Sequence, residues 1–64
     1  YINSDDVNIR IGPGTEYDSI TKKSTGTKVI RIVTNKYFYN NLCWDEIILP
    51  DGTKGFVANK YLSY

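Results

Sequence analysis

Alternating apolar and polar residues predict short strands along this chain, and no segment keeps a helical period over three turns. Val7-Asn8-Ile9-Arg10-Ile11 alternates with a period of two, which predicts a half-buried strand over residues 7–11. Gly12-Pro13-Gly14 ends this strand, because proline lacks an N–H donor and glycine admits positive φ angles. Residues 15–19 are then expected to form an exposed loop, and Ile20 is the next expected core residue.

The run Val29-Ile30-Arg31-Ile32-Val33 predicts a second strand over residues 28–33. Two registers fit this run: either Val29 and Arg31 or Ile30 and Ile32 face the core. Because burying an unpaired guanidinium is unfavourable, the isoleucines are the residues that we expect to face inward.

Two polar stretches flank this strand. Residues 22–27 are too polar for the interior and contain a turn at Gly26. Residues 34–41 contain the aromatic triplet Tyr37-Phe38-Tyr39 and are expected to form a loop or an irregular hairpin.

The last third of the chain predicts a β-hairpin and a short turn. Residues 44–49 are the third expected strand, in which Ile47 and Leu49 share one face and Trp44 lies on the other. Pro50-Asp51-Gly52 predicts a turn. Gly55-Phe56-Val57 begins a fourth expected strand, which pairs with the third strand across this turn. Residues 58–62 are expected to make one 3₁₀ turn and a brief strand. Short strands separated by Gly-containing turns predict an all-β protein, either a small barrel or an orthogonal sandwich.

Composition restricts the functions open to a chain of 64 residues. A single domain over residues 1–64 buries only about 60 % of its unfolded surface, which argues against a deep catalytic cleft. Eight Lys or Arg are interspersed with seven Asp or Glu, so no nucleic-acid partner is expected. No apolar run approaches the length of about 18 residues that a membrane span needs. Because the chain starts with neither an initiating Met nor a signal peptide, we expect it to be excised from a longer multidomain protein.

Groups that catalyse reactions are scarce. The chain contains no His, which removes Ser-His-Asp and Cys-His nucleophiles and the usual zinc sites. The single Cys43 is expected to be a small buried hydrophobe. The pairs Asp5-Asp6 and Asp45-Glu46 are expected to be solvated surface charges, because adjacent side chains on a strand point to opposite faces. We therefore expect a non-enzymatic protein with no catalytic residue, no cofactor and no metal.

Aromatic and acidic residues in the expected loops suggest binding instead. Trp44 would face the outer surface as a binding residue or cap the barrel, Tyr17 would face a ligand or pack over Pro13, and Tyr61 would keep one ring face on the core. Arg10 is expected to brace the Gly-Pro loop, and Glu16 and Asp18 suit a cationic ligand group such as a free amine. The expected ligand-binding residues are Glu16, Tyr17, Asp18, Tyr37, Tyr39, Trp44 and Tyr61.

Three motifs together resemble the bacterial Src-homology-3 domain family. They are the strand and turn over residues 7–14 followed by Tyr17, the element Gly26-Thr27-Lys28-Val29, and the closing hairpin from Trp44 to Leu62. The resemblance covers about residues 6–62, with Phe56 where the family commonly has a Trp. The stretch over residues 34–43 is longer than usual, and Arg31 falls at an apolar position of the family, which predicts a bulge there.

The resemblance implies a small SH3-like barrel of five to seven short strands. It also implies a non-catalytic module that binds peptidoglycan peptide or glycan and targets an attached hydrolase, phage lysin or surface protein, located outside the cell and associated with the cell wall. In that architecture, Trp44 borders a groove between residues 16–18 and 37–39, and Tyr61 closes it. The alternative is a protein–protein interaction or spacer domain that packs against a neighbouring catalytic domain of the same chain or holds a peptide segment. A proline-rich peptide is disfavoured, because Ala58 stands where eukaryotic relatives have a Pro.

Overall fold

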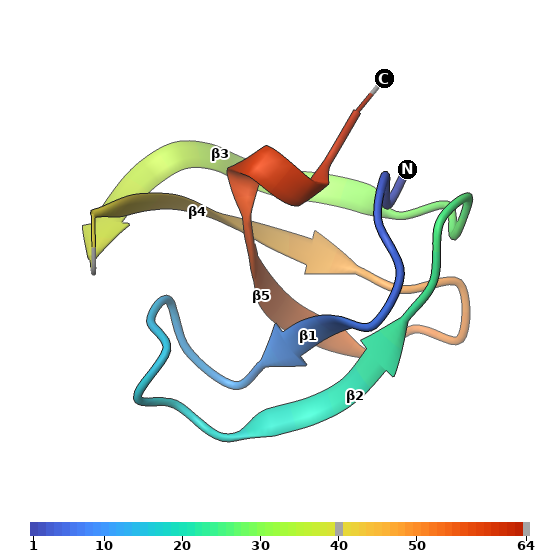
Figure 1. The fold of residues 1–64 in the computed structure, drawn as a ribbon, viewed down its shortest axis with the longest axis horizontal. Coiled ribbons are helices and arrows are strands. Elements are labelled where there is room, and N and C mark those ends of the chain that lie inside the picture. The colour runs from blue at the N-terminus through green and yellow to red at the C-terminus, as the bar shows by residue number, and fades with distance from the viewer. Residues whose placement is uncertain (40, 64) are drawn as a thin grey trace.

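Five antiparallel strands form one sheet that curls around the core (Figure 1). The computed structural model describes residues 1–39 and 41–63, and for residues 35 and 36 it describes the backbone only. The strands lie in the order β2-β1-β5-β4-β3. In chain order the elements are β1 (Val7–Arg10), β2 (Ser19–Lys23), β3 (Ile30–Tyr39), β4 (Leu42–Ile48), β5 (Lys54–Ala58) and the 3₁₀ helix η1 (Asn59–Tyr61). The prediction of a small all-β barrel with a 3₁₀ turn near the C-terminus is confirmed. The part of the chain that the structure describes has no helix with the length and apolar character needed to cross a membrane.

The hairpin of β4 and β5 has the predicted turn. The two strands pair from Trp44 opposite Ala58 to Ile48 opposite Lys54. Gly52 has a φ of 92°, in the left-handed region that glycine adopts without strain, and its N–H donates to the Leu49 carbonyl at 2.9 Å. A local turn signal was therefore sufficient to predict this hairpin.

The register of β3 is the opposite of the predicted one. Ile30 and Ile32 are 66 % and 44 % exposed, whereas Val29 packs against the core and the Arg31 side chain is only 14 % exposed. The prediction assumed an unpaired guanidinium, but Arg31 Nε lies 3.8 Å from Oδ2 of Asp45, which is fully buried. The expectation that Asp45 is a solvated surface charge is wrong for the same reason, since each group compensates the burial of the other.

Strand β3 is irregular where it pairs with β4. The register shifts between Arg31 and Val33 and again between Val33 and Tyr37, so the irregularity expected at Arg31 is present. Pairing then resumes and continues to Tyr39 opposite Leu42. Of the two predicted alternatives for the stretch 34–41, the irregular hairpin is therefore the one that forms, and residue 40 of that stretch lies outside the described residues.

The core draws on both ends of the chain. Ile2 pairs with Leu62 in an isolated antiparallel bridge, and its N–H donates to the Thr27 carbonyl at 2.8 Å. Ile20 is 42 % exposed because it is not the residue of β2 that pairs with the buried Ile9, so the prediction that it is a core residue is wrong. The clustered core residues are Ile2, Val7, Ile9, Ile47, Leu49, Val57 and Leu62.

Candidate functional site

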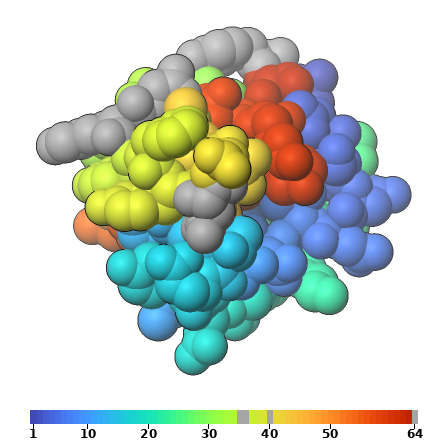
Figure 2. Space-filling model, turned by 60° about the vertical axis from the view of Figure 1, so that its left-hand side comes forward, coloured from blue at the N-terminus to red at the C-terminus, as the bar shows by residue number. Residues whose placement is uncertain are grey.

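A recess of about 170 Å³ lies where four segments of the chain meet. Figure 2 shows the face on which β1 and the residues before it (blue), the following loop (cyan), the β3–β4 hairpin (yellow) and η1 (red) come together. Pockets for whole drug-sized ligands hold about 300–1,000 Å³, so this recess suits one side chain or part of one sugar. Its lining residues are Asp5, Asp6, Val7, Asn8, Arg10, Thr15, Leu42, Trp44, Ala58 and Tyr61.

Trp44 forms one wall of the recess. It lies outside the core cluster that contains Ile47, as the alternation in β4 predicts, but it is only 2 % exposed. Its indole Nε1–H donates to the Tyr39 carbonyl at 3.0 Å, which satisfies the polar end of the buried ring and joins the two strands of the hairpin. Of the two predicted alternatives, Trp44 therefore fits the cap on the barrel, since it is a buried wall bonded to β3 and does not face outward.

Tyr61 forms a second wall at the end of η1. Its ring packs partly against the core, as predicted, and the Lys60 ammonium lies 5.1 Å from the ring centroid, within cation–π distance. The Tyr61 carbonyl accepts the Asn3 N–H at 2.9 Å, which ties η1 to the start of the chain. The fold thus brings together two of the predicted binding residues, Trp44 and Tyr61, from segments 17 residues apart in sequence.

Two exposed acidic residues line the recess together with these aromatic walls. Asp5 Oδ1 accepts the backbone N–H of Thr25 at 3.1 Å, and this hydrogen bond lowers the pKa of the Asp5 carboxyl. Asp6 has a φ of 56°, in the left-handed region that Asp tolerates better than most residues. Both residues are exposed surface charges, as predicted, but sequence reasoning missed that they line a recess. Their position beside η1 follows from the pairing of the chain ends, for which the local sequence has no signal.

The positive charge of Arg10 is directed at the loop after β1. Its Nη1 donates to the Tyr17 carbonyl at 2.9 Å and to the Thr15 carbonyl at 3.3 Å, which confirms that Arg10 braces this loop. The Tyr17 ring covers Gly12 so closely that a Cβ at Gly12 would lie 2.5 Å from Tyr17 Cδ1. The loop is therefore held by an arginine and an aromatic ring that packs on glycine.

The other predicted binding residues lie outside the recess. Glu16, Tyr17 and Asp18 are exposed in the loop after β1, and none of them lines it. Tyr37 packs edge-on against Phe56 with ring centroids 5.6 Å apart, and Tyr39 is exposed on β3. The structure thus separates the predicted site into the recess at Trp44 and Tyr61 and a set of surface residues around it.

The fold is thus a small all-β arrangement with a shallow recess lined by polar and aromatic residues. Within residues 1–39 and 41–63, no three Cys, Asp or Glu side chains are grouped so that they could hold a metal ion. Comparison of the chain with models of protein families, with curated proteins and with solved structures found no match.

Proposed function

We propose that this chain is a non-catalytic binding module of the bacterial Src-homology-3 type, which acts outside the cell and attaches a hydrolase or another surface protein to the cell wall. The observation that carries the proposal is the recess that Trp44 and Tyr61 line together with the acidic residues Asp5 and Asp6. Aromatic surfaces suit peptide and sugar groups. A carboxylate forms strong hydrogen bonds with an ammonium group, such as a free amine of a wall peptide.

The size of the recess sets the expected strength of binding. At about 170 Å³ it contacts one group of a polymer, so we expect weak binding by a single copy. Wall polymers repeat the same group many times. Two linked copies can then raise the apparent affinity by about 10²–10⁴ without any new contact.

Co-sedimentation of the fluorescently tagged chain with purified Gram-positive sacculi tests the proposal. The double variant Asp5→Asn, Asp6→Asn removes both carboxylates, and Asn also tolerates the left-handed backbone at position 6. Glu16→Gln with Asp18→Asn is the matched control, because it removes the same charge from residues outside the recess. We expect the first variant to bind at least about tenfold more weakly, since a hydrogen bond to a charged group contributes about 1.5–3 kcal/mol. The control should bind as the wild type does.

Other outcomes would contradict this site or this function. Equal losses in both variants would indicate long-range attraction instead of contact in the recess. A loss only in the control would place the ligand at residues 16–18, where the sequence pattern predicts it. If neither the wild type nor a tandem fusion of two copies sediments with sacculi from several genera, wall targeting is refuted.

A second recess favours a domain-packing role as the other candidate function. It has a volume of about 340 Å³ and lies away from Trp44 and Tyr61, with no lining residue in common. Ile30 at its edge is 66 % exposed. A neighbouring domain that packs here would bury this apolar surface, so Ile30→Lys in a protein that carries both domains should weaken the domain contact and leave wall binding unchanged. The lining residues are Lys28, Val29, Ile30, Ile48, Leu49, Pro50 and Gly52.

A further inference from the structure

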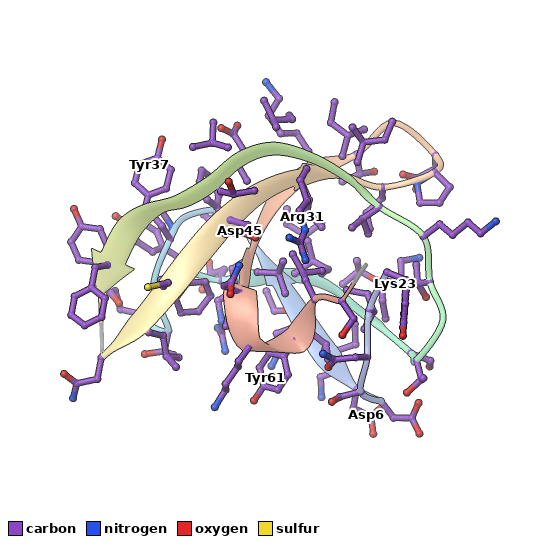
Figure 3. The ribbon with its side chains drawn as sticks, turned by 90° about the horizontal axis from the view of Figure 1, so that it is seen from above. Asp6, Lys23, Arg31, Tyr37, Asp45 and Tyr61 are labelled. Atoms are coloured by element: carbon purple, nitrogen blue, oxygen red, sulfur yellow. The ribbon has the colours of Figure 1, made fainter. Side chains whose placement is uncertain are left out.

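A buried carboxylate lies behind the wall of the recess. Asp45 follows Trp44 in β4 and has no exposed surface. Its Oδ2 accepts a hydrogen bond from Asn59 Nδ2 at 2.9 Å and lies 3.8 Å from Arg31 Nε. Figure 3 shows Arg31 and Asp45 next to each other, close to the 3₁₀ helix that contains Tyr61. One carboxylate therefore links β3, β4 and η1.

The buried Asp45–Arg31 ion pair is not by itself expected to add much to the free energy of unfolding. Removing two charged groups from water is so unfavourable that a buried ion pair is often no more stabilising than apolar residues of the same volume. A hydrogen-bonded charge differs from an apolar contact in being directional, because it holds its partners at a fixed distance and angle. Asp45 is thus suited to fix the position of the element with which it forms a hydrogen bond.

The 3₁₀ helix η1 is that element, and the start of the chain also holds it, because Asn3 Nδ2 donates to the Lys60 carbonyl at 3.1 Å. It has three residues and no side-chain hydrogen bond at its N-cap. Its backbone is closed by the Leu62 N–H, which donates to the Asn59 carbonyl at 3.0 Å. The Asn59 amide on Asp45 connects this short turn directly to the middle of β4.

The residues joined by this hydrogen bond are neighbours of the walls of the recess. Trp44 precedes Asp45, Ala58 precedes Asn59, and Tyr61 ends η1. Trp44, Ala58 and Tyr61 all line the recess. A shift of Asn59 relative to Asp45 would therefore change the separation of the two aromatic walls.

We propose that Asp45 and Asn59 are positioning residues: their hydrogen bond holds η1 against β4, and so sets the separation of Tyr61 and Trp44 that the ligand meets. Arg31 balances the charge of the Asp45 carboxylate. The effect on binding rests on the proposed function, whereas the effect on η1 can be measured without a ligand.

The first variant is Asn59→Ala, which removes the hydrogen bond and leaves Asp45 and Arg31 in place. The control is Asp51→Ala, which removes a hydrogen bond of the same 2.9 Å length, from the Thr53 N–H, in the turn between β4 and β5. Amide hydrogen exchange is measured at Leu62 and Asn3, whose N–H groups donate to Asn59 and Tyr61 of η1. Co-sedimentation with sacculi then measures binding.

We expect Asn59→Ala to speed exchange at Leu62 and Asn3 by about tenfold, with the amides of β1 and β2 unchanged, and to weaken sedimentation by a similar factor. Asp51→Ala should change neither measurement, although it also loses a hydrogen bond. A purely structural role would instead affect the two variants alike, and that result would overturn the proposal. Unchanged exchange in Asn59→Ala would also overturn it, as would faster exchange with full wall binding.

An exchange of the two side chains provides a rescue. Asn59→Asp alone places two carboxylates together and should loosen η1, whereas Asn59→Asp with Asp45→Asn restores an amide–carboxylate hydrogen bond with the partners exchanged. Slow exchange at Leu62 should return in the double variant, and failure to return would contradict the proposal. If the wild type does not bind sacculi, the proposed function fails, but the exchange rates of these variants still decide whether Asp45 and Asn59 position η1.

Discussion

Gly55 of β5 packs against β1, and the substitution Gly55→Ala tests how tightly this junction is packed. A Cβ at position 55 would lie 2.5 Å from Cγ2 of Ile9 and 3.2 Å from the Arg10 carbonyl oxygen. Carbon atoms pack best at about 3.5–4.0 Å, so Ile9 would have to move by about 1 Å. Ile9 is fully buried in a close-packed interior and has no free space for that movement.

The expected loss of stability follows from two opposing effects. Overpacking of this kind costs about 1–3 kcal/mol. Replacing Gly by Ala also lowers the conformational entropy of the unfolded chain, and this stabilises the folded state by about 0.4–1 kcal/mol and so offsets part of the overpacking cost. We therefore expect Gly55→Ala to lower the free energy of unfolding by about 1–2 kcal/mol and the melting temperature by about 5–15 °C, since a domain of this size loses about 4–8 °C per kcal/mol.

Urea and thermal unfolding followed by the fluorescence of Trp44, the single tryptophan, measure this change. Ile9→Leu moves the branch from Cβ to Cγ and so removes the Cγ2 that clashes, at a cost of less than about 1.5 kcal/mol. The penalty of Gly55→Ala should be smaller in the Ile9→Leu background. Gly52→Ala is the control. A Cβ at position 52 would meet no atom within 4 Å, but alanine is unfavourable there because the backbone φ is 92°, so its penalty should be the same with Ile9 or Leu at position 9. An equal penalty for Gly55→Ala in both backgrounds, or none, would refute the steric explanation.

Two further predictions concern surface charges. Hydrogen bonds from the Thr25 and Thr53 N–H groups lower the pKa of the Asp5 and Asp51 carboxyls in the folded state. The stability that these two hydrogen bonds contribute is therefore fully present above about pH 4, and it is lost as the pH falls through the lower pKa values of the folded state. The melting temperature should therefore fall in acid, and it should fall less steeply in an Asp5→Asn, Asp51→Asn variant; parallel curves would contradict this. Lys54→Ala should change the free energy of unfolding in urea by less than about 0.5 kcal/mol, because Lys54 Nζ lies 3.9 Å from Glu46 Oε2 and its side chain is 62 % exposed. A loss above about 1 kcal/mol would show that this ion pair matters.

The sequence by itself determined the elements whose signals are local. Alternation over residues 7–11 predicted β1, which ends one residue earlier, at Arg10. The turns at Gly26 and Gly52 both contain a glycine with positive φ. The 3₁₀ turn over residues 59–61 and the pairing of β4 with β5 also followed from short stretches of the chain. In each case the steric preference of a few adjacent residues decides the conformation, so no distant partner has to be known.

Only the tertiary structure decided how distant segments meet. Arg31 points inward because Asp45 comes from another strand to pair with it, which reverses the register expected for an isolated β3. Asp5 and Asp6 join Trp44 and Tyr61 because the two ends of the chain pair side by side. The free energy of a buried charge depends on its partner, and a recess exists only between assembled segments, so neither can be obtained from the order of residues within one segment.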